Sequence, residues 1–172
     1  MKKRLLLTGS MIAVLTLTGC KAEPQQTEHH HSSMDKVVPK GMKKAAHPKY
    51  EVGDKVTVLA DHMEGMKGAA ATISGAFDTT VYSVSYNPTN GGDKVDNHQW
   101  VVHEELKDVG GQALAKGDKA VITASHMKGM KGAEATIDSA KKTTVYMIDY
   151  VDQKTGEKMV NHKWLVEDEL KQ

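Results

Sequence analysis

The chain carries the same unit twice. From Gly53 onward, the sequence recurs from Gly117 with a constant offset of 64 residues and without a gap to the C-terminal end. About half of the aligned residues are identical. Because each copy is too short for a large domain, a chain of 172 residues built this way is expected to form two similar small units. The duplication limits the fold more than any single motif does.

Alternating hydrophobic residues within each unit predict short β-strands. In the first unit they are Val56, Val58 and Ala60, then Ala69, Ala71 and Ile73, then Tyr82, Val84 and Tyr86. The Gly-Asp-Lys-Val opening and the Gly-rich turns resemble KOW and other SH3-like barrels. We therefore expect a mainly β protein with two tandem small SH3-like (KOW-like) β-barrel repeats, residues 50–110 and 111–172. Trp100 and Trp164 should be largely buried in them.

The N-terminal segment has the pattern of a bacterial lipoprotein signal peptide. A basic start and a short apolar stretch precede Cys20, which is the only Cys of the chain. The Leu-Thr-Gly-Cys sequence ending there resembles a lipobox, and the alternative is an ordinary secretion signal with an incidental Cys. We expect residues 1–19 to be removed and Cys20 to carry lipid, palmitate included. The protein would then be anchored at the extracytoplasmic face of the cell membrane.

Residues 20–49 are expected to form a flexible, disordered tether between the lipid and the folded units. They contain three Pro residues, many Lys residues and no hydrophobic periodicity. His29, His30 and His31 lie in this tether. Three adjacent His residues can bind a divalent ion loosely, but a short His run also arises by chance, so the role of this segment stays open.

Composition excludes several classes of function. The formal net charge is +1, and the only Arg, Arg4, lies in the signal peptide. Without clustered positive charge or Arg side chains, we expect no nucleic-acid partner. The single Cys is assigned to lipid, and no Ser-His-Asp set or phosphate-binding loop is evident, so we do not expect an enzyme.

The motif with the most distinctive chemistry is His-Met-x-Gly-Met-Lys-Gly-Ala, which occurs once in each unit between its first two strands. Imidazole with two thioethers and no thiolate is a soft ligand set that suits Cu(I) better than Zn(II), Ca(II) or Mg(II). The alternative is that one Met of each pair fills the end of a small hydrophobic core. The candidate metal ligands are His62, Met63 and Met66 in the first unit and His126, Met127 and Met130 in the second.

His98 and His162 form a second repeated pattern, Asn-His-x-Trp. Each is either a structural residue at a strand edge or a further nitrogen ligand that completes the site begun by the His-Met turn. The two units also differ between 87 and 91, where the first unit has Asn-Pro-Thr-Asn-Gly. We expect that difference to alter a distal turn more than the candidate site.

Together, the lipobox, the tandem units, the His-Met turns and the Asn-His-x-Trp strands resemble the YdhK family. These are bacterial, mainly Gram-positive, lipoproteins with a duplicated domain, and the CopL-like members are associated with copper resistance. The resemblance implies a membrane-anchored protein that binds copper, preferably as Cu(I), and sequesters it or hands it to a copper transporter or other copper-handling protein. The alternative function is a cell-envelope adhesion module that recognises wall polymer or protein through its barrels.

Overall fold

The computed structural model describes residues 38–172, and this part of the chain is almost entirely β-structure. No helix within it is long and apolar enough to cross a membrane. The signal peptide, Cys20 and the His29–His31 segment lie outside the described residues. The strands and the two short 3-10 helices are, in order, β1 Lys43–Lys44, β2 Lys55–Val58, β3 Ala70–Tyr86, β4 Val95–Val102, η1 His103–Glu105, β5 Lys119–Val121, β6 Glu134–Val151, β7 Lys158–Val166, η2 Glu167–Glu169 and β8 Leu170–Lys171.

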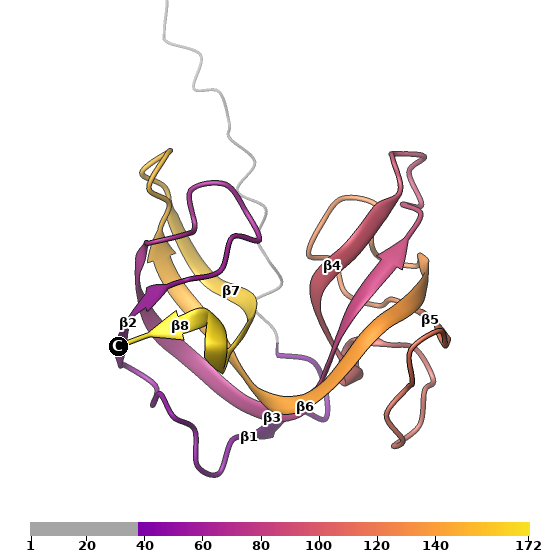
Figure 1. Ribbon diagram of the computed structural model, residues 1–172, viewed down its shortest axis with the longest axis horizontal. Helices are drawn as coiled ribbons and strands as arrows, with labels where there is room; N and C mark the ends of the chain where they lie inside the picture. The colour runs from indigo at the N-terminus through magenta and orange to yellow at the C-terminus, as the bar shows by residue number, and fades with distance from the viewer. Residues whose placement is uncertain (1–37) are drawn as a thin grey trace, which may run out of the picture. The chain divides into compact units, whose positions relative to one another are not determined.

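The long strands β3 and β6 are the centre of the fold. They pair antiparallel along nearly their whole length, from Ala71 opposite Tyr150 to Tyr86 opposite Ala135, and Figure 1 shows them running side by side through the molecule. Thr79 lies opposite Thr143, which is its equivalent in the other repeat. Equivalent residues can face each other in this way only if the two repeats are related by an approximate two-fold axis.

Two hydrophobic cores lie on either side of that axis, and each one combines residues from both repeats. The lobe 1 core is built from Tyr50, Val56, Val58, Ala60, Met66, Ala69, Ala71, Ile73 and Ala76 of the first repeat with Tyr146, Ile148, Tyr150, Leu165 and Leu170 of the second. The lobe 2 core reverses this, with Tyr82, Val84, Tyr86, Val101 and Leu106 of the first repeat and Ala120, Ile122, Ala124, Met130, Ala133, Ala135 and Ile137 of the second. Each lobe thus takes the N-terminal half of one repeat and the C-terminal half of the other.

A third cluster packs where the two lobes meet. Trp164 is fully buried there against Phe77, with ring centroids 5.9 Å apart, while Trp100 packs at its edge and is only partly buried. The burial predicted for Trp164 is confirmed, and the two equivalent Trp residues differ in how deeply they are buried.

The predicted β class, the duplication and the buried alternation of β2 are confirmed. The strand pattern differs from expectation, because the segments around Ile73 and Tyr82 form one 17-residue strand instead of two. The order β5-β6-β3-β2-β8, with β1, β4 and β7 on its sides, is one open sheet and not two closed barrels. Between these two segments, Gly75 and the Asp-Thr-Thr stretch stay extended because they pair with β6. The SH3-like identity stays a prediction.

The folded part of the chain also begins before residue 50. β1 pairs with Asp78 and Phe77 of β3, and Val38 and Met42 pack against the central cluster. The described end of the segment assigned to the flexible tether, residues 38–49, therefore contributes one short strand to the sheet and packs against the folded part. The boundary near residue 110 divides the sequence repeats but does not divide the two cores.

Separate repeats should not fold, because each would supply only half of each core. We expect residues 38–110 and residues 111–172, made as separate peptides, to give unfolded circular-dichroism spectra on their own and a β spectrum when mixed in equal amounts. The covalent fragment 38–172 is the control. Cooperative unfolding of either peptide as a monomer, with its mass checked by sedimentation, would contradict the crossed arrangement of the cores.

Candidate functional site

The two His-Met motifs form turns that are held by the hairpin tips of the opposite repeat. Gly65 and Gly129 lie in these turns with φ of 82° and 78°, a conformation that favours glycine. The backbone N–H of Gln153 donates to the carbonyl of Gly65 at 3.0 Å, and that of Thr89 donates to Gly129 at 2.9 Å. The turn at 87–91, expected to be distal, thus contacts the second His-Met turn directly.

The methionines of each motif separate into two environments. Met66 and Met130 are fully buried in the lobe 1 and lobe 2 cores, which is the packing role left open from the sequence. Met63 and Met127 are 41% and 48% exposed. The structure therefore does not bring both thioethers of one motif together at the surface, and the exposed one is the residue next to the His.

His98 lies beside the His-Met turn of the other repeat. Its ring centroid is 6.2 Å from that of His126 and 6.2 Å from that of Tyr86. The Tyr86 hydroxyl is in turn 4.0 Å from the sulfur of Met127. His98, His126 and Met127 therefore gather in lobe 2, although His98 belongs to the first repeat and the other two belong to the second.

His162 occupies the equivalent place in lobe 1. Its ring packs edge-on against that of Tyr150, with the ring centroids 5.5 Å apart, and the residue is only 3% exposed. Asn161 before it and Asn97 before His98 have φ of 53° and 51°, a left-handed conformation that Asn tolerates. The repeated Asn thus has a structural explanation, since it turns the strand at the residue before each His.

Three of the four ring nitrogens of these strand histidines are buried without a hydrogen-bond partner. Nε2 of His98 and both ring nitrogens of His162 make no hydrogen bond. Burial lowers the pKa of His98 to about 4, and the neighbouring His126 and His62 lower it too, against the opposing effect of Glu105. Burial, then His62 and His126, lower the pKa of His162 to about 4. Both imidazoles are therefore neutral at physiological pH.

Two glutamates, which the sequence analysis did not single out, fix the turn histidines: Glu105 is buried and Glu169 is partly buried. Glu105 accepts from His126 Nε2 at 2.8 Å and from the Trp164 indole at 3.1 Å. Glu169 accepts from His62 Nε2 at 2.7 Å and from the Trp100 indole at 3.0 Å. We call these two arrangements the crossed carboxylate clamps, because each Glu holds a His and a Trp of the other repeat.

Electrostatics at the second clamp favour the charged carboxylate. Burial raises the pKa of Glu169, but the hydrogen bonds from His62 and from the Val166 N–H outweigh it, and the pKa is lowered overall. The repeated Glu-Leu-Lys ending of the two units was the signal that could have identified these residues. Their partners, however, belong to the opposite repeat, which the sequence alone does not reveal.

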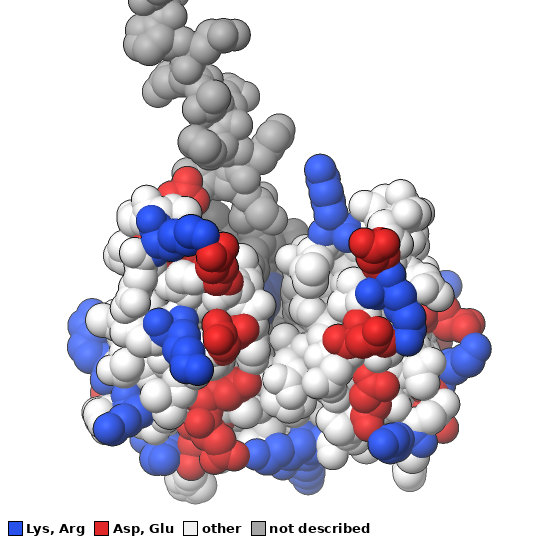
Figure 2. Space-filling view, turned by 45° about the horizontal axis from the view of Figure 1, so that its top comes forward, with Lys and Arg blue, Asp and Glu red and all other residues white. Residues whose placement is uncertain are grey.

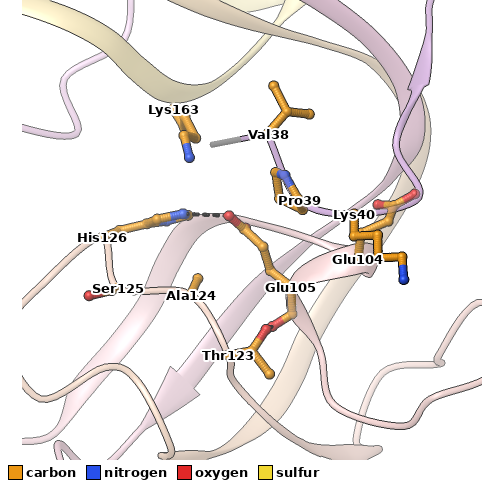
Figure 3. Close-up of a pocket in the computed structure, with 10 residues that line it drawn as sticks. All are labelled: Val38, Pro39, Lys40, Glu104, Glu105, Thr123, Ala124, Ser125, His126 and Lys163. Atoms are coloured by element: carbon orange, nitrogen blue, oxygen red, sulfur yellow. Dashed lines mark hydrogen bonds and ion pairs between the residues drawn. The ribbon is translucent and has the colours of Figure 1, made fainter. Parts of the chain in front are cut away.

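A pocket of about 320 Å³ borders the first clamp. Figure 3 shows the Glu105–His126 contact along this pocket, with Lys163 on one side and Val38 of the N-terminal segment above it. On the face of the molecule drawn in Figure 2, Lys side chains are interspersed with Asp and Glu side chains, and uncharged surface lies between them. That face carries no extended basic patch of the kind that binds a phosphate backbone.

The donor types at hand set what the site can hold. Within residues 38–172, no group of three or more His, Cys, Asp or Glu side chains converges in a way that would hold a metal ion. Each lobe instead brings a turn His, a strand His and an exposed Met into one neighbourhood. A site for a soft ion would therefore have to include the thioether.

Acid should destabilise the protein through the two strand histidines. Their folded-state pKa of about 4 lies below the unfolded value of about 6.5, so the unfolded state binds more protons below pH 6.5. Their contribution is fully present above pH 6.5 and is lost as the pH falls toward 4, by up to about 3 kcal/mol for each residue. Urea unfolding at a series of pH values should show that the free energy of unfolding falls more steeply toward low pH in the wild type than in His98→Gln/His162→Gln. An equal pH dependence of the unfolding free energy in the two proteins would contradict this role of the strand histidines.

Comparison with known proteins places the chain in a family. A family model described as a protein of unknown function (DUF1541) matches residues 52–103 and again 116–167. The chain is 50% identical over 176 residues to the Bacillus subtilis (strain 168) protein named Uncharacterized protein YdhK, over 96% of this chain and 86% of that protein. The crystal structure of a DUF1541 family protein (ydhK) from B. subtilis has a TM-score of 0.77 at 58% identity, over 78% of this chain and 92% of that chain. The solution NMR structure of the ydhK C-terminal domain from B. subtilis has a TM-score of 0.68 at 60% identity, over 70% of this chain and 92% of that chain. This chain therefore belongs to the DUF1541 family, to which YdhK also belongs.

Proposed function

We propose that this protein binds Cu(I) outside the cytoplasm, with one ion in each lobe. The ligands in lobe 1 are His62, Met63 and His162, and those in lobe 2 are His126, Met127 and His98. The observation that carries the proposal is that each strand His has a buried ring nitrogen without a hydrogen-bond partner, and that in lobe 2 this ring lies beside that of the turn His. A buried polar atom without a partner costs free energy, and a bound ion would remove that cost.

The protonation of these groups suits a metal ligand. A neutral imidazole offers a nitrogen lone pair, and the lowered pKa keeps His98 and His162 neutral well below pH 7. Thioether needs no deprotonation, and it survives in an oxidising envelope better than a thiol does. Two imidazoles and one thioether form a donor set that favours Cu(I) or Ag(I) over Zn(II).

Met66 and Met130 are not in this ligand set. Each is fully buried in a hydrophobic core, where it packs with the Tyr residues and aliphatic side chains of its lobe. The six candidate ligands of the two His-Met turns are thereby reduced to the four that lie near the surface.

The exposed and the buried methionines provide a matched test. We expect the 38–172 fragment to bind two Cu(I), measured by competition with a chromophoric Cu(I) chelator. The variant Met63→Leu/Met127→Leu should lose affinity at both sites, because Leu keeps most of the volume and removes the sulfur. Zn(II) should compete poorly in the same assay.

The control is Met66→Leu/Met130→Leu, which makes the same chemical change inside the cores. It should retain two Cu(I) and change only the stability, by less than about 1.5 kcal/mol for each residue. If substitution of the two buried methionines abolishes binding and substitution of the two exposed ones does not, the ligand assignment is wrong. Binding that persists in both double variants would reject thioether ligands altogether.

The surface gives less support to the adhesion alternative. A wall-binding groove would be expected to display aromatic side chains. Among the described residues, none of the exposed large hydrophobic side chains is aromatic: they are Val52, Leu59, Met63, Met127, Val151 and Val160. We therefore propose copper binding as the function. The protein would sequester the ion or deliver it to a copper transporter or other copper-handling protein.

The location follows from the N-terminal pattern. We propose that Cys20 carries the lipid that attaches the protein to the extracytoplasmic face of the membrane, because the only Cys stands at the end of the lipobox-like sequence. A single acyl chain gives marginal binding, so a diacylglyceryl group supplies the stable attachment. The folded sites would then lie close to the membrane but outside it.

Replacing this Cys tests the location without touching the folded part. Cells that express Cys20→Ser should accumulate an unlipidated precursor that incorporates no labelled palmitate. Metal binding by the purified 38–172 fragment does not involve the anchor and serves as the functional control. Unchanged palmitate labelling in the variant would exclude Cys20 as the attachment point.

A further inference from the structure

We infer that Glu105 and Glu169 are positioning residues that select which nitrogen of each turn histidine is left to bind a ligand. The inference rests on the proposed function and names a part of the site beyond its ligands. Each glutamate acts on the His of the opposite repeat. Every metal site would therefore depend on both copies of the sequence.

The hydrogen bonds hold each carboxylate from several directions. Besides His126 and the Trp164 indole, Glu105 accepts from the Val102 N–H at 3.1 Å. Glu169 accepts from the equivalent Val166 N–H at 2.8 Å. One oxygen of each carboxylate receives the indole and the backbone N–H, and the other oxygen is hydrogen-bonded to the imidazole. The oxygen that faces the His is thus fixed in place.

The carboxylate determines the tautomer. An ionised carboxylate has no proton to donate, so the Nε2 atom of His126 must carry the hydrogen of this bond. A neutral imidazole with a proton on Nε2 has its lone pair on Nδ1. Among the described residues, no hydrogen bond involves Nδ1 of His62 or His126. Each clamp therefore leaves Nδ1 as the nitrogen that can bind an ion.

Backbone contacts place the clamp and the turn on one framework. The carbonyl of Glu105 accepts from the N–H and the hydroxyl of Thr123, three residues before His126, at 2.8 and 2.9 Å. The carbonyl of Glu169 accepts from the N–H of Leu59, also three residues before its His, at 2.8 Å. Movement of the carboxylate relative to the ring is therefore restricted by both the side chain and the main chain.

This arrangement has a known energetic role in metal sites. A carboxylate that accepts from the far nitrogen of a ligating His orients the ring and raises its basicity, and its loss typically costs 10- to 100-fold in metal affinity. The negative charge of each carboxylate also offsets the positive charge of a bound ion. The Trp indoles, which satisfy the second oxygen, explain why the repeated motif ends in Trp.

The test measures the tautomer directly in the metal-free 38–172 fragment. With 15N-labelled His at pH 8, two-bond 1H–15N correlation spectra should show His62 and His126 with the proton on Nε2. In Glu105→Gln the His126 pattern should shift toward a mixture or toward Nδ1–H, because an amide can also donate. His62 should stay unchanged in that variant, and Glu169→Gln should give the mirror result.

Metal affinity supplies the second readout. Titration with Ag(I) or Cu(I) should show a 10- to 100-fold loss at the lobe 2 site in Glu105→Gln, with the lobe 1 site retained. The control is Glu104→Gln, the neighbouring residue, whose carboxylate accepts from the Thr79 hydroxyl at 2.6 Å and is not hydrogen-bonded to any His of residues 38–172. It should leave both the spectra and the affinities unchanged.

The outcomes separate this inference from the proposed function. A wild-type spectrum with the proton of His126 on Nδ1 would overturn the inference even if Glu105→Gln failed to fold. An unchanged His126 tautomer or unchanged affinity in a folded Glu105→Gln would overturn it as well. If the tautomers shift as expected but the wild type binds no Cu(I), the positioning role is supported and the copper assignment fails.

Discussion

The antiparallel pairing of β3 with β6 determines the rest of the structure. Because Thr79 faces its own equivalent, Thr143, the pairing sets an approximate two-fold axis between the repeats. The end of the first repeat then packs in one core with the start of the second, and the end of the second repeat packs in the other core with the start of the first. The two mixed cores are a direct result, and so is the single open sheet.

The same crossing assembles the candidate sites. A turn from one repeat meets a strand His and a Glu from the other, so His126 lies between His98 and Glu105. The carboxylate of Glu105 is buried and that of Glu169 is partly buried, but each is satisfied by an imidazole, an indole and a backbone N–H, which makes this burial tolerable. Structural and chemical roles therefore coincide in the clamps, since they join the repeats and orient the rings of the turn histidines.

Local sequence patterns predicted the local features of the fold. They did not predict the contacts between residues that lie far apart in the sequence. Period-two alternation identified Val56, Val58 and Ala60 as buried, and the duplication was readable by inspection. The sequence pointed to the turn and strand histidines, and left open whether one Met of each pair packs in a core. It could not show that Gly75 continues a strand, because only pairing with β6 keeps that residue extended. Nor could it show which repeat supplies the partner of His98, since swapped and unswapped pairings bury the same residues.

The approximate two-fold axis has a consequence for how such a chain can change. In a homodimer of single-repeat chains with this topology, every substitution would appear in both lobes at once. Joining the copies in one chain removes that restriction, so each lobe can be altered by itself. The buried Lys163 where the first repeat has Gln99, and the turn tip of Pro88 to Asn90 where the second has Asp152 to Lys154, are differences of this kind. Two lobes with one shared architecture are thereby free to acquire different affinities.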